Sequence, residues 1–230
     1  MPRVVDHEAR RRQIAEAVWA VIALRGLEAV SLREVASQAG VSMGMVQHYF
    51  RSKDAMLLFA CEHIVERADE MAAAMTAGSD DPASPRTIIR NVLTLGVPLR
   101  EEERLATGVW FAFVTRAVID EELAALIRRS WSGTHDLMVG QLHRAQERGE
   151  VAVDVDVERA AIALVALIDG LVSHVMVGHY TTDQAMAAVD LHLDHLFAGT
   201  RQPPDLRAED HMAGHAASGR RRNTGRDRRA

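Results

Sequence analysis

The 230-residue sequence has one cysteine, six prolines and few aromatic side chains, which form 4% of the chain. The single thiol, Cys61, excludes an internal disulfide framework and fits a reducing compartment. Because it stands beside Phe59 and Ile64 in a predicted helix, we expect a buried structural thiol. No basic segment followed by an apolar stretch opens the chain, so we expect no signal peptide and a cytoplasmic location.

The usual catalytic motifs are also missing. The chain has no Gly-x-Ser-x-Gly elbow, no phosphate-binding glycine loop and no His-Glu-x-x-His pair. These absences argue against an enzyme, and we expect no cofactor. Four histidines lie near one another in the C-terminal part, at His174, His179, His192 and His195. They lack a cysteine or carboxylate at matching pitch, so no metal site is predicted, and a metal-sensing regulator remains an alternative.

We find no internal repeat, and no segment that alternates with the period of a strand beyond residues 151–155. The longest apolar run, residues 160–177, is interrupted by Asp169, Gly170, Ser173 and His174. An aspartate at the centre of a membrane span is costly. The run therefore predicts a buried helix of a soluble protein, with no membrane partner. With hydrophobic residues at 48% of the chain, the pattern is typical of an all-α fold with an aliphatic core.

Charge is distributed unevenly along the chain. Residues 1–54 hold eight Lys/Arg against six Asp/Glu, residues 55–199 hold 11 against 22, and residues 200–230 hold eight against four. The acidity lies in the middle, while both ends are basic. A net charge of −5 is therefore compatible with nucleic-acid binding, because a DNA-binding region needs only a local positive potential.

Residues 31–50 have the anatomy of a helix-turn-helix. Ser31 and Glu34 form a capping box that begins a helix, and Gly40 supplies the positive φ that ends it. Ser42 caps a second short helix, which buries Val46. An ordinary pair of antiparallel helices would share these features. The next residues favour DNA binding, because a helix beginning near Lys53 offers a cation and free amides to a phosphate.

The second helix of this motif is predicted to be the recognition helix. Its outward residues Met43, Gly44 and Gln47 are the expected base readers, with Gly44 permitting close approach of the backbone. The expected phosphate contacts lie around them and are Ser31, Arg33, Ser42, His48, Tyr49 and Lys53. The cluster Arg10–Arg12 in the preceding helix is expected to be a solvated face.

The remaining helices are expected at about residues 6–25, 53–76, 85–99, 102–118, 120–148, 157–179 and 182–197. With the motif, this makes about nine helices. We divide the chain into a three-helix DNA-binding head (1–54), a helical body (55–199) and a disordered basic tail (200–230). The last predicted helix begins with the capping box Thr181-x-x-Gln184.

Residues 8 to about 60 resemble the DNA-binding domain of the TetR family of bacterial transcriptional regulators. The matching residues are Ile14, Ala15, Ala17, Gly26, Leu32, Val35, Ala36, Ala39-Gly40-Val41-Ser42, Gly44, Tyr49-Phe50, Lys53 and Leu57. Many members carry Tyr where this chain has Gln47, whose amide is able to bond adenine bidentately. A weaker similarity, in Ala166-Leu-Ile-Asp-Gly-Leu171, is to the branch that includes the choline-responsive repressor of betaine synthesis.

The last two helices carry small residues at i+3 and i+4 steps, a pattern that favours close packing against a second copy. The expected dimer contacts are Ala166, Gly170, Ser173, Val177, Ala188, His192 and Leu196. The resemblance also implies a dimer, joined by a four-helix bundle. It further implies an effector cavity in the body, for which the candidates are Trp110, Phe113, Trp131, Met138, His143 and His174. Core packing is the simpler interpretation for most of these six, while a tryptophan could hold an amine by cation–π attraction.

The patterns and the resemblance together predict a homodimeric repressor that binds a palindromic double-stranded operator. Its release by a small-molecule effector is implied by the resemblance. Repression, rather than activation, is implied by the resemblance. The alternatives are the metal sensor and a protein that binds DNA without sequence preference.

Overall fold

The structure, a computed structural model, describes residues 4–198, with the side chains of residues 4–6, 101 and 102 left aside. The predicted all-α fold is confirmed: this part of the chain holds nine α-helices, a short 3-10 turn and no strand. The predicted tail, residues 200–230, lies outside it. The elements are α1 Val4–Arg25, η1 Leu27–Ala29, α2 Leu32–Ala39, α3 Met43–Tyr49, α4 Lys53–Ala77, α5 Pro85–Thr94, α6 Glu101–Ala117, α7 Glu121–Glu147, α8 Val157–Met176 and α9 Thr182–Phe197.

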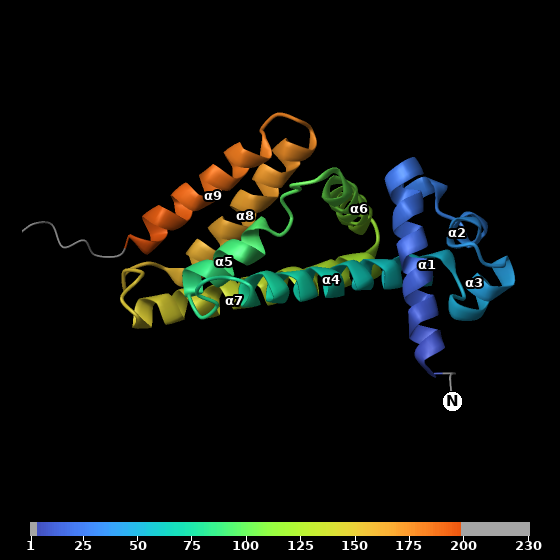
Figure 1. Cartoon of the computed structure of the whole chain (residues 1–230), viewed down its shortest axis with the longest axis horizontal. Coiled ribbons are helices and arrows are strands. Elements are labelled where there is room, and N and C mark those ends of the chain that lie inside the picture. The colour runs from blue at the N-terminus through green and yellow to red at the C-terminus, as the bar shows by residue number, and fades with distance from the viewer. Residues whose placement is uncertain (1–3, 199–230) are drawn as a thin grey trace, which may run out of the picture.

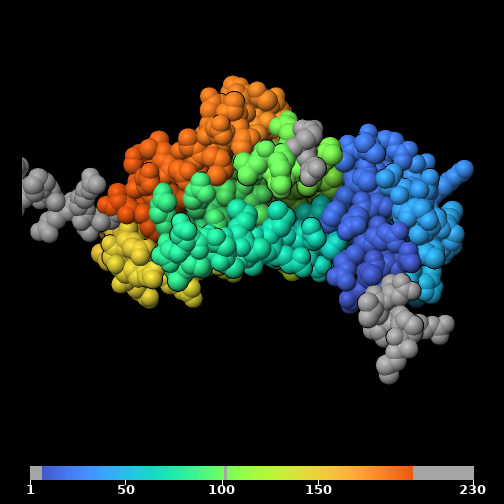
Figure 2. Space-filling view, in the orientation of Figure 1, coloured from blue at the N-terminus to red at the C-terminus, as the bar shows by residue number. Residues whose placement is uncertain are grey.

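The helices form an elongated molecule with a head at one end. Helices α1, α2 and α3 make up the head, and α4 leaves it to run along the body (Figure 1). Helix α6 lies beside α1, whereas α8 and α9 pack together farther away (Figure 1). In the space-filling view the head and the end of α9 occupy opposite ends of the particle (Figure 2). The body therefore separates the last helix from the head.

Side-chain caps begin several of these helices. The Thr181 hydroxyl accepts a hydrogen bond from the Gln184 amide at 3.2 Å, and the Gln184 side chain accepts one from the Thr181 amide at 2.9 Å. The predicted box is therefore present. At α7 the Asp120 carboxylate accepts from the Leu123 amide at 3.3 Å. Such caps satisfy amides that have no partner within the helix.

Two predicted helices are shorter than expected. The helix expected at 85–99 ends at Thr94, where the Thr94 hydroxyl donates to the Arg90 carbonyl at 2.8 Å. Gly96 and Pro98 follow, and proline disfavours helical backbone in the residue before it. The helix expected to reach residue 179 ends at Met176, and Gly178 has a φ of 76°. Periodicity alone extended both helices past these breaks.

The apolar core of the head continues into the body. Ile14, Val18, Val35, Val46 and Phe50 are buried in one cluster. The same cluster includes residues of three body helices, namely Met56, Leu57, Ala60, Cys61, Val109, Phe113, Leu123, Leu126 and Ile127. The boundary at residue 54 therefore stays a prediction, and displacement of α6 or α7 would disturb the packing under the head.

Helix α8 is less buried than its composition suggested. By length and composition α8 is the one described helix that could cross a membrane, and 22% of its apolar window is buried. One such helix is weak evidence for a membrane span. The expectation of a buried helix is wrong for the isolated chain, since Ile162 of α8 is 59% exposed and Val177, the residue after the helix, is 80% exposed. The apolar run therefore presents a face that the described chain leaves uncovered.

Candidate nucleic-acid interface and body groove

The turn of the helix-turn-helix has the predicted geometry. Gly40 adopts φ 66° and ψ 31° in the left-handed region, where a Cβ would be strained. The Val41 amide then donates to the Ala36 carbonyl at 3.0 Å. On either side, Ser31 accepts from the Glu34 amide at 3.1 Å and Ser42 from the Met45 amide at 3.2 Å. The serine caps at the beginning of α2 and of α3, together with the hydrogen-bonded turn between them, fix the orientation of α3 relative to α2.

Helix α1 supports the motif from behind. The Gln13 side-chain amide donates to the Ala39 carbonyl, near the end of α2, at 2.9 Å. The Trp19 indole donates to the Ala60 carbonyl of α4 at 2.9 Å. With Val46 fully buried, α3 is anchored by its inner face while its outer face remains available.

The expected base readers lie on that outer face. Met43 is 45% exposed, and Gly44 and Gln47 are exposed as well. A Cβ built on Gly44 would meet nothing closer than the Ser42 hydroxyl oxygen at 4.0 Å. Because neither φ nor packing requires glycine there, the fold leaves the residue free to serve an external contact.

The expected phosphate contacts are arranged around the same surface. Arg33 and His48 are exposed, and Lys53 is the half-buried first residue of α4. Each capping hydroxyl, of Ser31 and of Ser42, accepts one hydrogen bond and keeps its own O–H available as a donor. Tyr49 is half-buried, with its ring 4.7 Å from the His7 ring in an edge-on contact. DNA contact by this set stays a prediction.

The expectation of a solvated arginine face is wrong for Arg11. Its guanidinium carbon lies 3.9 Å from the centroid of the Phe59 ring and 5.5 Å from that of Phe50. Its Nε is buried without a hydrogen-bond acceptor among the described residues. A cation over aromatic rings is attracted by their quadrupoles, so Arg11 joins α1 to the start of α4. The run of arginines in the sequence gave no signal for it.

The six residues proposed to line an effector cavity do not meet in one place. Phe113 is fully buried in the head cluster, which Trp110 borders, and Met138 is fully buried in a separate cluster with Ile89 and Leu164. His143 and His174 are exposed on the surface. Aromatic and histidine content alone cannot show which helix faces converge. The six candidates therefore include residues of two separate buried clusters and residues on the surface.

Trp131 is the member of the set that lines an open groove. The groove lies between α7 and α8 and has a volume of about 420 Å³. Its lining consists of Trp131, Ser132, His135, Asp136, Ile162, Val165, Ala166 and Asp169. No arginine or lysine is among these residues. The groove therefore combines apolar walls with acidic groups.

Asp169 is one of the groove residues that sequence reasoning missed. Its carboxyl has surface exposed to solvent, yet neighbouring groove atoms displace water from it, and this desolvation raises its pKa. Among the described residues, no charged or hydrogen-bonding neighbour offsets that effect. The sequence signal for this position is an aspartate inside an apolar run.

His135 lies on the other wall of the groove. Its Nε2 is 3.4 Å from a carboxylate oxygen of Glu158 in α8, and its Nδ1 is 3.6 Å from one of Asp136. These contacts link α7 to α8 and involve both ring nitrogens. Among the described residues no group of three or more His, Cys, Asp or Glu could hold a metal ion, so the metal-sensing alternative gains no support here.

The residues predicted to contact a second copy lie on the outside of the body. Ala166 and Gly170 of α8 are exposed, as is Val177 directly after the helix, and Ser173 is half-buried. On α9, Ala188, His192 and Leu196 are half-buried. A Cβ built on Gly170 would have no neighbour within 4 Å. The isolated chain therefore gives no packing reason for a glycine at position 170.

Comparison with known proteins agrees with this architecture. Residues 14–59 match the family described as bacterial regulatory proteins, tetR family. Residues 85–198 match the BetI-type transcriptional repressor, C-terminal domain. The chain is 34% identical over 176 residues to the HTH-type transcriptional regulator PksA of Bacillus subtilis, covering 76% of this chain and 83% of that protein. It is 31% identical over 175 residues to BetI of Paraburkholderia phymatum, covering 74% and 83%.

Solved structures show the same fold. A TetR-family regulator from Rhodococcus sp. superposes with a TM-score of 0.74 at 24% identity, covering 82% of this chain and 99% of that one. A transcriptional regulator from Saccharomonospora viridis in complex with choline has a TM-score of 0.73 at 26% identity, covering 82% and 97%. The curated relatives are transcriptional regulators, not enzymes. The chain therefore belongs to the TetR family of transcriptional regulators, with a helix-turn-helix head and a BetI-type C-terminal domain.

Proposed function

We propose that this protein is a homodimeric, ligand-responsive repressor that acts in the cytoplasm. In this proposal two copies of α3 enter successive major grooves of a palindromic operator, and binding of a small-molecule effector releases the DNA. The observation that carries the proposal is the exposed face of α3, with Met43, Gly44 and Gln47 outward on a helix whose inner face is fully packed.

The exposed ridge of α8 supports assembly into a dimer. A helix with apolar residues on more than one side must bury them, and a twofold contact covers the same patch on each subunit. Gly170 has neither a positive φ nor a close neighbour in the isolated chain. Close approach of a second α8 explains a small residue at this position. Two heads then read two half-sites about one helical turn apart.

The shared core of head and body allows a ligand bound in the body to affect the head. Val109 and Phe113 of α6 are buried in the same cluster as Ile14 and Val18 of α1. A ligand that prefers a body geometry in which the heads do not fit the operator weakens DNA binding. By linkage, DNA then weakens ligand binding by the same factor. A preference of about 1–3 kcal/mol corresponds to roughly 5- to 150-fold. The structural relative in complex with choline supports an amine as the effector.

Selection of duplex DNA from a random library tests the proposal as a whole. The full chain should enrich a palindrome, bind it as two copies per duplex, and keep a preference of about 10³-fold or more over random duplex at fixed salt. Enrichment of no common sequence, or equal affinity for selected and random duplexes, would leave only sequence-independent DNA binding.

Two glycine variants test whether the exposed face of α8 around Gly170 forms the dimer contact. Gly170→Arg places a bulky cation on the ridge of α8, and Gly140→Arg makes the same change on α7. Both glycines are exposed, and neither has a neighbour within 4 Å of a built Cβ. In sedimentation analysis Gly170→Arg should shift the protein toward monomer, whereas Gly140→Arg should remain dimeric. A dimer unaffected by Gly170→Arg would place the interface elsewhere.

A further inference from the structure

We propose that Arg11 is a positioning residue for DNA recognition, whose cation–π contact with Phe59 and Phe50 sets the orientation of α3 relative to α4. This inference rests on the proposed function, because it names a residue that places the recognition helix. Arg11 belongs to α1, Phe50 is the C-cap of α3, and Phe59 lies in the second turn of α4. One guanidinium therefore joins the three elements that meet behind the recognition helix.

The orientation of α3 depends on contacts at its end. The helix has seven residues, of which only Val46 is buried, and so short a helix is marginal in water without tertiary contacts. At its last turn Tyr49 packs edge-on against His7 of α1. The next residue, Phe50, is 3% exposed, and its ring centroid lies 5.5 Å from the guanidinium carbon of Arg11. Two successive turns of α1 thus hold the end of α3.

Aromatic contacts continue from this point along α4. The ring centroids of Phe50 and Phe59 lie 5.4 Å apart, and the Phe59 ring is stacked with that of His63 at 6.3 Å. The His63 ring is in turn stacked on Trp19 of α1 at 5.0 Å. Helix α4 is therefore held against α1 around Arg11 and again around Trp19. Since α4 leaves the head to run along the body (Figure 1), the contact around Arg11 ties the direction of α3 to that of α4.

The burial of the guanidinium points to a geometric role. The Arg11 Nε is buried without a hydrogen-bond acceptor among the described residues, and an unpaired buried donor is destabilising. A methionine would fill the space with apolar atoms and leave no donor unpaired. A planar guanidinium gains from an aromatic ring only when it lies over the ring face. Arg11 therefore favours one arrangement of the Phe59 ring, whereas an apolar side chain would permit several.

A change in the direction of α3 should affect the two kinds of DNA binding differently. Sequence-independent binding comes from contacts with phosphates and tolerates such a change. Base readout requires side chains within hydrogen-bond reach of the base edges. Loss of the Arg11 contact should therefore lower affinity for the operator more than it lowers affinity for random duplex.

Fluorescence anisotropy with the selected palindrome and with random duplex, at one salt concentration, tests the full-length Arg11→Met and Arg11→Lys variants. Arg11→Met should lower the ratio of operator affinity to random-duplex affinity about tenfold. That loss equals about 1.4 kcal/mol, within the range of cation–π contacts. Arg11→Lys keeps a cation over the rings and should lose less. An unchanged ratio in Arg11→Met, or an equal loss in Arg11→Lys, would overturn the inference.

Arg12→Met is the matched control. Arg12 is the next residue of α1 and is exposed, and within the described chain it stacks on no ring. The substitution removes the same charge from the same helix, so it should leave the affinity ratio unchanged even where it weakens binding to both duplexes. A ratio that falls as far in Arg12→Met as in Arg11→Met would assign the effect to charge alone and overturn the positioning role.

Phe59→Leu makes the same test from the other partner, and it keeps the proposal testable where Arg11→Met fails to fold. It should lower the affinity ratio as Arg11→Met does. The double variant should lose no more than the larger single loss, because both changes remove one contact. Losses that multiply would show that Arg11 acts on DNA independently of Phe59 and would overturn the proposal.

Melting curves establish that each variant is folded at the assay temperature, so that a change in the ratio reports the folded protein. The wild-type chain is measured alongside. If it selects no palindrome, the proposed function itself fails. If it selects one and the ratio is unchanged in Arg11→Met and in Phe59→Leu, only the positioning role of Arg11 fails.

Discussion

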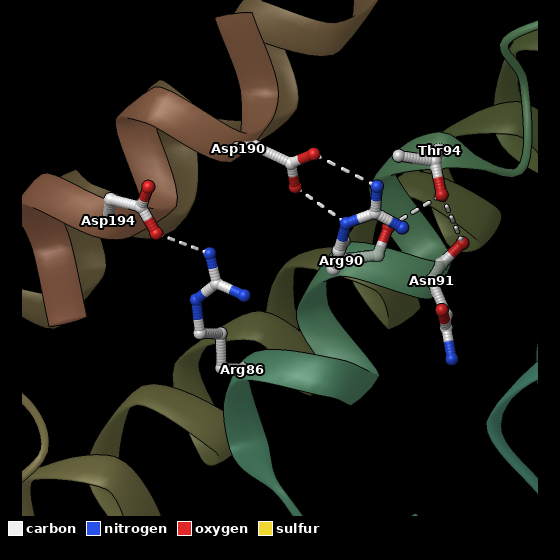
Figure 3. A network of polar contacts seen from close by, with 6 residues as sticks. All are labelled: Arg86, Arg90, Asn91, Thr94, Asp190 and Asp194. Carbon is white, nitrogen blue, oxygen red and sulfur yellow. Dashed lines mark hydrogen bonds and ion pairs between the residues drawn. The ribbon is translucent and has the colours of Figure 1, made fainter. Parts of the chain in front are cut away.

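Arg90 of α5 and Asp190 of α9 form a two-pronged ion pair (Figure 3). The Nε of Arg90 donates to Oδ1 of Asp190 at 2.6 Å and its Nη2 to Oδ2 at 3.0 Å. One turn away, Arg86 donates to Asp194 at 2.6 Å. The partners run in opposite directions along the two helices, so α5 and α9 lie antiparallel at this contact. This pairing fixes the last helix on the body and thereby orients its outer face.

We predict that Asp190→Asn lowers the free energy of unfolding at pH 7 by about 1 kcal/mol or less, since the pair is partly solvated. The hydrogen bond from Arg90 lowers the pKa of Asp190. The stabilisation is therefore present above the ordinary aspartate pKa and is lost as pH falls through the lowered folded value. Urea unfolding between pH 2.5 and 7 should show the difference shrinking at the acid end. A constant difference would contradict the assignment.

Gly44→Ala should separate fold from function. A glycine inside a helix costs about 0.5–1 kcal/mol relative to alanine, and the added Cβ has room. We predict equal or higher thermal stability together with weaker operator binding, because the methyl group would hold the backbone away from the bases. Melting curves and fluorescence anisotropy measure the two effects. Unchanged affinity would show that no close approach occurs at Gly44.

Lys53→Ala should weaken binding to all duplexes alike. The residue begins α4, where its ammonium and the helix N-terminus favour a phosphate. Losing one phosphate contact should reduce the slope of log affinity against log salt by about one unit. Titrations at four salt concentrations with operator and random duplex give that slope. A loss confined to operator, with the slope retained, would identify Lys53 as a base reader instead.

Gln47→Ala should change the sequence preference of DNA binding and leave its salt dependence unchanged. An amide paired with adenine discriminates against other bases by about 1–3 kcal/mol, so its removal should relax preference at one position in each half-site. Affinities for operators substituted symmetrically at each position locate that site. The salt slope should stay the same, and an unaltered sequence preference would show that Gln47 reads no base.

Asp169→Asn should stabilise the ligand-free protein. Since desolvation raises the pKa of Asp169, its ionised form is disfavoured in the folded state, and the cost applies above that raised pKa. The gain from the substitution should therefore be present at pH 7–8 and vanish as pH falls below the ordinary aspartate pKa. Asparagine and aspartate have similar helix propensities. A lower melting temperature for the variant at pH 7.5 would mean that the carboxylate has a stabilising partner.

The head could be predicted in detail because its structure is local. Two serine caps, a glycine turn and the i, i+3, i+4 pattern of α2 lie within about twenty residues, and each constrains the next. The early end of α5 could not be predicted from hydrophobic periodicity. The hydrogen bond from the Thr94 hydroxyl to the Arg90 carbonyl, which lies at this end, leaves no trace in that pattern.

The body could be predicted only as a set of helices. The contacts between faces of α6, α7 and α8 depend on packing between distant segments. Sequence patterns therefore do not separate pocket positions from core positions such as Phe113 and Met138, each of which is fully buried in a different cluster. Arg11 was missed for the same reason, because Phe59 lies 48 positions farther along the chain. The exposure of α8 could not be predicted either, because its apolar composition alone favours a buried helix.

The central claim is that two recognition helices, held by one dimer, read a palindrome together. The most direct measurement compares the affinity of the full chain, at one salt concentration, for the selected palindrome and for the same duplex with one half-site scrambled. We predict two chains on the intact palindrome and at least about hundredfold weaker binding to the half-scrambled duplex. Equal affinity for the two duplexes, or one chain bound to the intact palindrome, would contradict the account.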